Sequence, residues 1–335
     1  FVGLIPSAVT PQAPSTIRLI GAMPVVYLMP ALALAWLWQQ IEVHQWSHDG
    51  RRRLAKGGLV TLFVLLFVGN LVSTVRDGFV RWPMALETRL KYQTVWQDVA
   101  AYLQKAPQDG LVFADGFYRP ITADSLRRNL AFPLPARWVQ TGAGVAGAIV
   151  LPQEEDAHLY VPEFAAPDMQ LMQAAGIDPT PLYRSRGTPS FAVYELPGTP
   201  ELTFSSQPAT FGGVITLVGY NTLLASDQVS LQLFTIWQVE DSLPDDLASF
   251  AHWLDEDGAI ISQHDGFDAA PQLLRPGDLV VQRHVLPLTG PLPQGENELH
   301  VGLYTREDGN RLVREEGSAE KSDRVILPIE SPFDR

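Results

Sequence analysis

Two long apolar stretches near the start of the chain, residues 19–41 and 58–75, constrain its fold more than any other feature. The first holds 23 residues without a charge, and at 1.5 Å per residue it would form a helix of roughly 34 Å. Such a helix is long enough to cross a hydrocarbon core of about 30 Å. The second holds 18 residues, also uncharged, with Asn70 inside it. We therefore predict a membrane region over residues 1–90 that contains two transmembrane helices.

Aromatic residues support a membrane location for the first stretch. Trp36, Trp38 and Trp46 gather at its end, as an interfacial aromatic belt would. A buried helical hairpin of a soluble protein is the alternative. A secretory signal peptide is disfavoured because the chain opens FVGLIPSAV, without a basic start or a small-residue cleavage site. Because the chain begins on Phe1 within an apolar run, we expect it to be the C-terminal fragment of a longer protein.

Charge is divided unevenly along the chain. Residues 1–91 carry nine Lys/Arg and four Asp/Glu, a net +5, whereas residues 92–335 carry fifteen and thirty-three, a net −18. Four basic residues fall within 51–56, between the two apolar stretches, and favour a cytoplasmic loop. We therefore predict a multi-pass protein of the cell membrane with its C-terminal domains outside the cytoplasm. Because the large part is acidic, it disfavours nucleic acid as a partner.

The region after the membrane segments is typical of a small α/β domain over residues 91–200. Its pattern mixes helical spacing with short buried apolar runs. The expected helices and strands are a helix over 87–105, strands at 111–114, 148–151 and 159–161, a helix over 167–175 and a strand at 191–196.

The last third of the chain changes to short alternating strands, with Asp257-Gly258 and Asp308-Gly309 as hairpin turns. This pattern predicts an antiparallel β-sandwich, jelly-roll-like, over residues 208–330, after a linker at 197–208. The seven expected strands are 214–220, 229–237, 249–254, 259–263, 279–286, 298–304 and 324–329. The predicted fold class is thus multidomain: two transmembrane α-helices, a small α/β domain and a β-sandwich.

A glycine-rich run matches a nucleotide-binding fingerprint in its letters only. Gly142, Gly144 and Gly147 have the G-x-G-x-x-G spacing. The fingerprint requires a helix after the third glycine, whose N-terminus receives the pyrophosphate. Here AIVLP follows and is typical of a strand. We therefore interpret the run as a flexible loop and predict no cofactor.

Clusters of titratable residues do not match a metal or catalytic motif. Asp255, Asp257 and Asp265, with His252 and His264, lack the Asp-x-Asp-x-Asp-Gly frame and later Glu of a calcium loop. A charged hairpin turn explains the same residues, so no metal is predicted. No motif of a serine or cysteine nucleophile is evident, the chain has no cysteine, and no catalytic residue is assigned.

Three residues are candidates for binding. Trp237 and Trp253 have rings that stack on sugars in other settings, although large aromatics in a sandwich are more often core residues. Arg18 stands before the first apolar stretch. Its planar guanidinium suits a lipid phosphate, while the alternative is an arginine that reaches the membrane interface.

Several segments resemble one family of enzymes. PSTIRLIGAMPVVYL, with Pro14, Arg18 and Pro24, resembles the entry to a late transmembrane helix of the bacterial family 39 glycosyltransferases. These are multispanning GT-C type enzymes related to protein mannosyltransferases and aminoarabinose transferases. FGGVITLVGY, LQLFTIW, FAHWLDEDGAIISQHDG, LLRPGD and HVGLYTREDGNRL, within residues 208–315, resemble a β-sandwich appended to many bacterial members.

The resemblance implies transfer of a sugar from a polyprenyl-phosphate donor to an extracytoplasmic acceptor, a glycan or a protein. In that family the catalytic acid lies in the first extracytoplasmic loop, near the N-terminus. The fragment would lack that acid and would be inactive alone, whereas the full-length parent would be an enzyme. The alternative is a non-catalytic, membrane-anchored carbohydrate-binding or structural protein. In either case membrane lipid is a partner.

Overall fold

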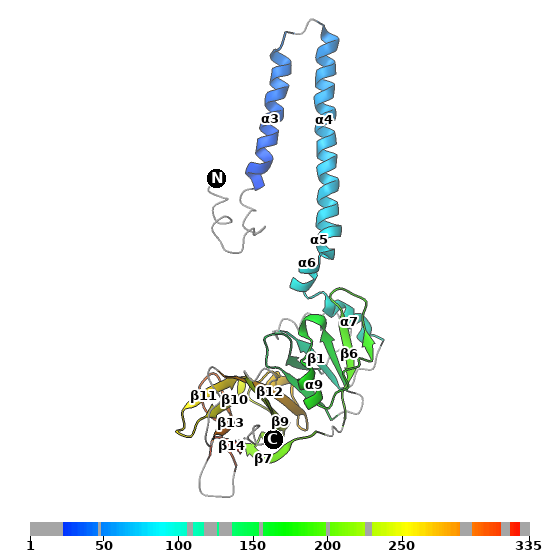
Figure 1. Ribbon diagram of the computed structural model, residues 1–335. Helices are drawn as coiled ribbons and strands as arrows, with labels where there is room; N and C mark the ends of the chain where they lie inside the picture. Colours follow the sequence, from blue (N-terminus) through cyan, green and yellow to red (C-terminus); the bar gives the residue numbers. More distant parts are fainter. Residues whose placement is uncertain are drawn as a thin grey trace. The chain divides into compact units, whose positions relative to one another are not determined.

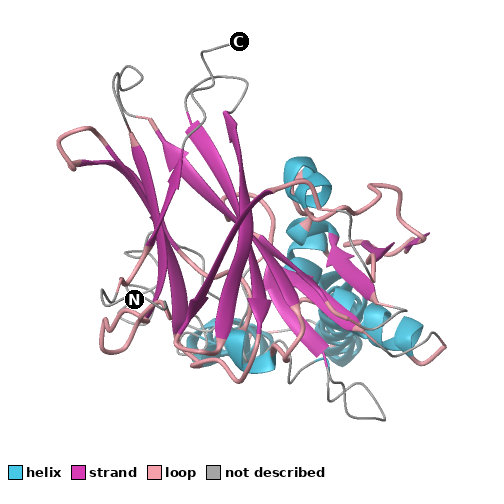
Figure 2. Cartoon of the chain, turned by 90° about the horizontal axis from the view of Figure 1, so that it is seen from below, coloured by secondary structure: helices cyan, strands magenta, loops and turns pink. Residues whose placement is uncertain are grey.

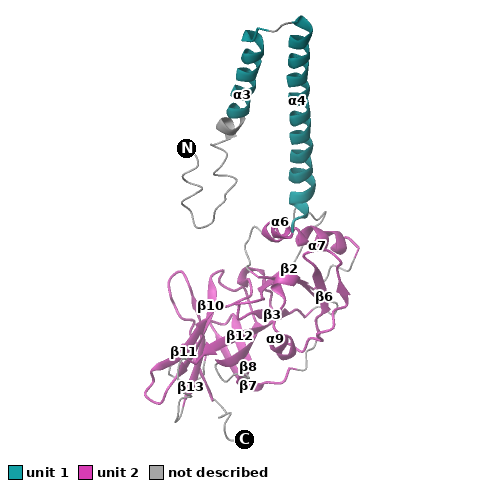
Figure 3. Ribbon diagram, turned by 45° about the horizontal axis from the view of Figure 1, so that its top comes forward, with its two compact units in different colours: residues 1–85 teal, residues 86–335 magenta. Residues whose placement is uncertain are grey.

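The computed structural model contains two compact units, residues 1–85 and residues 86–335 (Figure 1, Figure 3). The residues that the structure describes are 23–45, 48–105, 110–116, 126, 136–153, 157–198, 202–224, 230–288, 297–315 and 322–328.

The first unit contains two long helices, α3 (Met23–Val43) and α4 (Asp49–Val75), which contact each other. A π-helical turn, η3 (Arg76–Arg81), and a last turn, α5 (Trp82–Met84), continue α4. At the loop end, Lys56 Nζ lies 2.6 Å from Glu42 Oε1 and 4.8 Å from the ring centre of Trp38. This ion pair and cation–π contact join the two helices.

One described helix, Asp49–Met84, is long and apolar enough to cross a membrane, judged by its length and composition. None of the side chains of α4 is buried. The other helix, α3, has an apolar body but ends in Gln39, Gln40 and Glu42, and it does not meet the same standard over its described residues. The structure therefore supports one membrane-spanning helix, where the sequence predicted two.

The second unit begins with two short helices and a mixed sheet. The predicted helix over 87–105 is divided into α6 (Leu86–Lys91) and α7 (Val95–Leu103), because Gln93 between them has a left-handed φ of 48°. The sheet has the order β2-β1-β4-β6-β5. Strands β1, β2 and β4 are parallel, β6 is antiparallel to β4, and β5 is antiparallel to β6. Its strands are β1 (Leu111–Asp115), β2 (Ala136–Gln140), β4 (His158–Pro162), β5 (Tyr183–Arg184) and β6 (Phe191–Glu195).

Each face of this sheet is covered. Buried side chains of α7 pack on one face, where Trp96 contacts Phe113 and Trp138 with ring centres 5.8 and 5.0 Å apart. The other face packs against α9 (Met169–Ala174) and against the β-rich remainder of the unit. The prediction of a mixed α/β region is confirmed, and the short α9 starts with Asp168 accepting a hydrogen bond from Gln170 N.

The remainder of the unit is antiparallel, as predicted. Two sheets, β11-β10-β13-β14 and β3-β12-β9-β8-β7, share one hydrophobic core (Figure 2). Their strands are β3 (Ala148–Leu151), β7 (Ser205–Phe211), β8 (Ile215–Leu224), β9 (Ser230–Val239), β10 (Leu247–Leu254), β11 (Ile260–Asp265), β12 (Leu279–Pro287), β13 (Glu298–Thr305) and β14 (Val325–Pro328). Two 3-10 turns, η4 (Glu163–Ala165) and η5 (Pro271–Leu273), complete the described elements.

The α/β region and the sandwich are joined more closely than two domains on a linker. Strand β3, within the range predicted for the α/β domain, pairs with β12 in the second sheet of the sandwich. Arg137 on β2 and Asp278, just before β12, form a buried bidentate ion pair with N···O distances of 2.7 and 3.0 Å. Strand β7 also begins inside the predicted linker. These contacts hold residues 86–335 together as one unit.

Candidate functional site

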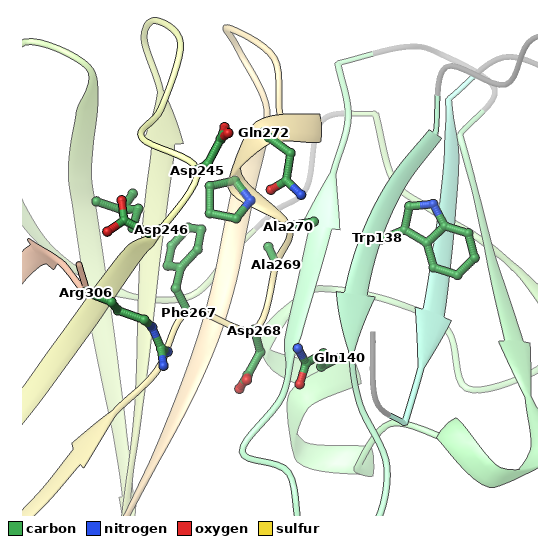
Figure 4. Close-up of a pocket in the computed structure, with 12 residues that line it drawn as sticks. Trp138, Gln140, Asp245, Asp246, Phe267, Asp268, Ala269, Ala270, Gln272 and Arg306 are labelled. Carbon is green, nitrogen blue, oxygen red and sulfur yellow. The ribbon is translucent and has the colours of Figure 1, made fainter. Parts of the chain in front are cut away.

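A pocket of about 320 Å³ opens where the mixed sheet meets the sandwich, within the second unit (Figure 4). Three separate segments line it: the end of β2, the residues just before β10, and the connection between β11 and β12. Arg306, just after β13, completes the wall. The volume is at the lower end of the usual range for small-molecule sites, about 300–1,000 Å³.

The β11–β12 connection is held firmly against β2. Gln140 N donates to Asp268 O at 2.6 Å, and Ala270 N donates to Trp138 O at 2.9 Å. The carboxylate of Asp268 accepts from Gly147 N at 2.7 Å and from Gln282 Nε2 at 3.0 Å. This wall of the pocket is therefore fixed before any ligand arrives.

The wall from the sandwich is fixed in a similar way. Arg306 N donates to Asp246 O at 3.2 Å, and Glu307 N donates to Asp246 Oδ2 at 2.7 Å. Asp246 thus ties the segment before β10 to the turn after β13. Its neighbour Asp245 is exposed at the rim.

The lining is polar and carries excess negative charge. Asp245, Asp246 and Asp268 contribute carboxylates, and Arg306 contributes the one cationic side chain among the lining residues. The ring of Trp138 turns away from the other lining residues into the aromatic cluster behind the sheet (Figure 4). The apolar part of the lining therefore comes from Leu247, Phe267 and residues 269–271.

A second polar group lies inside the sandwich. His284 on β12 is fully buried, and its Nδ1 lies 3.1 Å from His264 Nδ1 on β11. Its Nε2 lies 3.3 Å from Thr235 Oγ1, which also accepts from Trp237 Nε1 at 2.8 Å. Burial, together with the nearby His264, lowers the pKa of His284 to about 3. His264 is half-buried, whereas His284 and Thr235 lie in the core, so protonation of His284 would place a charge inside the sandwich.

The two tryptophans considered for sugar stacking lie in the core. Trp237 has no exposed surface and Trp253 is 4% exposed. They occupy inward positions on β9 and β10, as the alternative interpretation expected. Neither offers a ring face to a sugar in this structure.

The glycine-rich run forms a loop and the acidic run at 255–258 forms a hairpin turn, as the sequence predicted. Gly142, Gly144 and Gly147 have positive φ angles in a loop that leads into strand β3, so no helix N-terminus follows them. Asp255 closes the β10–β11 hairpin by accepting from Asp257 N and Ala259 N. In the described part of the chain, no three His, Asp or Glu side chains are grouped so as to hold a metal ion.

Arg18 lies outside the described residues, so its role as a lipid-phosphate ligand stays a prediction. The residues of the pocket were not among the sequence candidates. Their only local signal was a cluster of acidic residues beside turns, because the pocket depends on segments more than a hundred residues apart, such as Gln140 and Asp268.

No protein-family model matches this chain, and a search of curated proteins finds no significant match. The functional interpretation therefore depends on the geometry above and on the sequence resemblance already described.

Proposed function

We propose that this chain is the C-terminal part of an integral-membrane glycosyltransferase of the family 39 type, which transfers a sugar from a polyprenyl-phosphate donor to an extracytoplasmic acceptor. The observation that carries the proposal is the exposed apolar helix Asp49–Met84, continuous in sequence with an α/β and β-sandwich unit. The sandwich segments quoted above, within residues 208–315, resemble those appended to bacterial members of that family.

The proposal includes two membrane spans, α3 and α4, joined by a cytoplasmic loop. Arg51, Arg52 and Arg53 lie at the start of α4, and their positive charge favours the cytoplasmic side. The Lys56–Glu42 pair would then lie near the inner interface and join the two spans. The acidic second unit would lie outside the cytoplasm, where it meets a glycan or protein acceptor.

A sugar-transfer assay on the full-length protein, expressed from the complete reading frame, tests this function. The protein is reconstituted in liposomes with radiolabelled polyprenyl-phosphate sugars, and release of polyprenyl phosphate is measured. We expect release that depends on the protein, and a reduction of about tenfold in Arg18→Ala if that guanidinium binds the donor phosphate. Arg51→Ala, in the first turn of α4, is the matched control and should retain activity. No release with any donor would contradict the proposal.

A second function is favoured by one observation, the polar pocket of the second unit. A non-catalytic, membrane-anchored protein that binds carbohydrate or serves a structural role needs such a pocket but no donor lipid. The liposome assay separates the two, because a binding protein releases no polyprenyl phosphate.

A further inference from the structure

Some polar side chains of the pocket form no hydrogen bond or ion pair with the rest of the described chain. Among the described residues, Asp245, Gln272 and Arg306 line it without a hydrogen bond or ion pair from their side chains. They come from three different segments of the chain. Donors and acceptors that converge on one cavity, on walls that are already fixed, are typical of a site for a small polar ligand.

The charge of the lining limits the ligand. Three carboxylates face one guanidinium, so a phosphate or a carboxylate would meet net repulsion. A simple cation has no use for Arg306 or for the amide of Gln272, which would be left unpaired in the site. An uncharged ligand that both donates and accepts hydrogen bonds satisfies all of these groups.

The shape and apolar part of the lining limit the ligand further. Phe267 and Leu247 are 7% and 3% exposed and give the pocket a small apolar surface beside its polar rim. A ligand that fills about 320 Å³ against them must be small and must present both hydroxyl groups and C–H groups. A single sugar ring has these properties.

We infer that this pocket binds one uncharged sugar residue, with Asp245 accepting hydrogen bonds from its hydroxyl groups and Arg306 donating to its oxygen atoms. The inference deepens the proposed function, and it rests on the role of the second unit in meeting a glycan. The site is distinct from Trp237 and Trp253, which are enclosed in the core.

Saturation-transfer NMR on the full chain in lipid nanodiscs tests the inference. Nanodiscs avoid detergents that carry sugar head groups. The probes are the methyl glycosides of glucose, galactose, mannose and N-acetylglucosamine, with putrescine as the cationic probe and inorganic phosphate, observed by phosphorus NMR, as the anionic one. We expect signal from at least one glycoside and no binding of phosphate or putrescine.

Two variants identify the site. Asp245→Ala should weaken glycoside binding by about tenfold or more, since hydrogen bonds to a charged group are among the stronger ones. Asp257→Ala removes an exposed carboxylate from the β10–β11 hairpin and should leave binding unchanged. Absence of binding by every glycoside, preference for putrescine or phosphate, or equal binding in both variants would overturn the inference.

The assay contains no donor lipid, so its outcome is independent of sugar transfer. If the glycosides do not bind but sugar transfer is intact, the sugar site is contradicted and the glycosyltransferase function is supported. Intact binding without transfer would favour the carbohydrate-binding alternative.

Discussion

The two units of this protein treat their apolar side chains in opposite ways. On α4, Phe63 and Leu65 are 47% and 65% exposed, and no side chain of that helix is buried. In the second unit, Phe113 and Trp237 have no exposed surface. The second unit therefore completes its own core in water, whereas the first needs an apolar surrounding to cover its helices. The same residue types thus form a core in one unit and an exposed apolar surface in the other, which a membrane would cover in the proposed function.

The largest effect should follow from breaking the buried ion pair of the second unit. Arg137→Ala removes the cation from the buried ion pair with Asp278, which should lower the free energy of unfolding by about 3–5 kcal/mol. Urea unfolding followed by tryptophan fluorescence measures the change. Arg324→Ala, which removes an exposed partner of Asp323, is the control and should cost about 0–1 kcal/mol. Equal costs would show that the pair does not join the two regions.

A charge in the middle of α4 should have the next largest effect, and on the first unit only. Leu66→Arg places a cation at the centre of the apolar stretch, at a cost of about 2.5–3.5 kcal/mol for membrane insertion. Extraction from membranes by alkaline carbonate should rise. Val313→Arg, at an exposed apolar position of the second unit, should leave extraction unchanged. If both variants stay equally membrane-bound, α4 is not the anchor.

Acid should weaken the second unit. His284 has a pKa of about 3 in the folded chain, while the unfolded chain binds a proton near 6.5. The unfolded state therefore takes up the proton first, and stability falls as the pH decreases from about 6.5 towards 3. Between pH 6.5 and 5 the loss should be roughly 2 kcal/mol. Urea unfolding at a series of pH values measures it, and His284→Leu should flatten the dependence.

The smallest effect concerns the contact between the two helices. Lys56→Ala removes an ion pair with Glu42 and a cation–π contact with Trp38, and the loss should be small because exposed pairs contribute little. Cross-linking between cysteines placed on α3 and α4 should become slower. Lys105→Ala, in the second unit, is the control and should leave that rate unchanged. An unchanged rate in Lys56→Ala would show that other contacts hold the helices together.

The strands of the sandwich could be predicted from sequence because alternation reports which face of a strand is buried. Strand β2 was missed, since Arg137 interrupts its short apolar run and is buried only because Asp278 meets it. Strand β7 was placed in the linker because it contains Pro208, which an edge strand tolerates at the irregularity between Ser206 and Ala209. Local pattern carries no information on such distant partners.

The candidate site was beyond sequence reasoning for the same reason. The pocket exists because the β11–β12 connection pairs with the end of β2, as in the bridge between Val139 and Ala269. Nothing in either segment predicts the other. The two tryptophans that the sequence suggested as binding residues fill the sandwich core, so their rings are not accessible at the surface.

Cysteine accessibility tests the proposed contrast between a membrane unit and an external unit most directly. The chain has no cysteine, so a single introduced thiol gives no background. Gly50→Cys reports on the first turn of α4, where a side chain meets open space, and Ser242→Cys reports on an exposed turn of the second unit. In spheroplasts, a membrane-impermeant maleimide should label Ser242→Cys at once and Gly50→Cys only after permeabilisation. Labelling of both positions from outside, or of Gly50→Cys alone, would contradict the account.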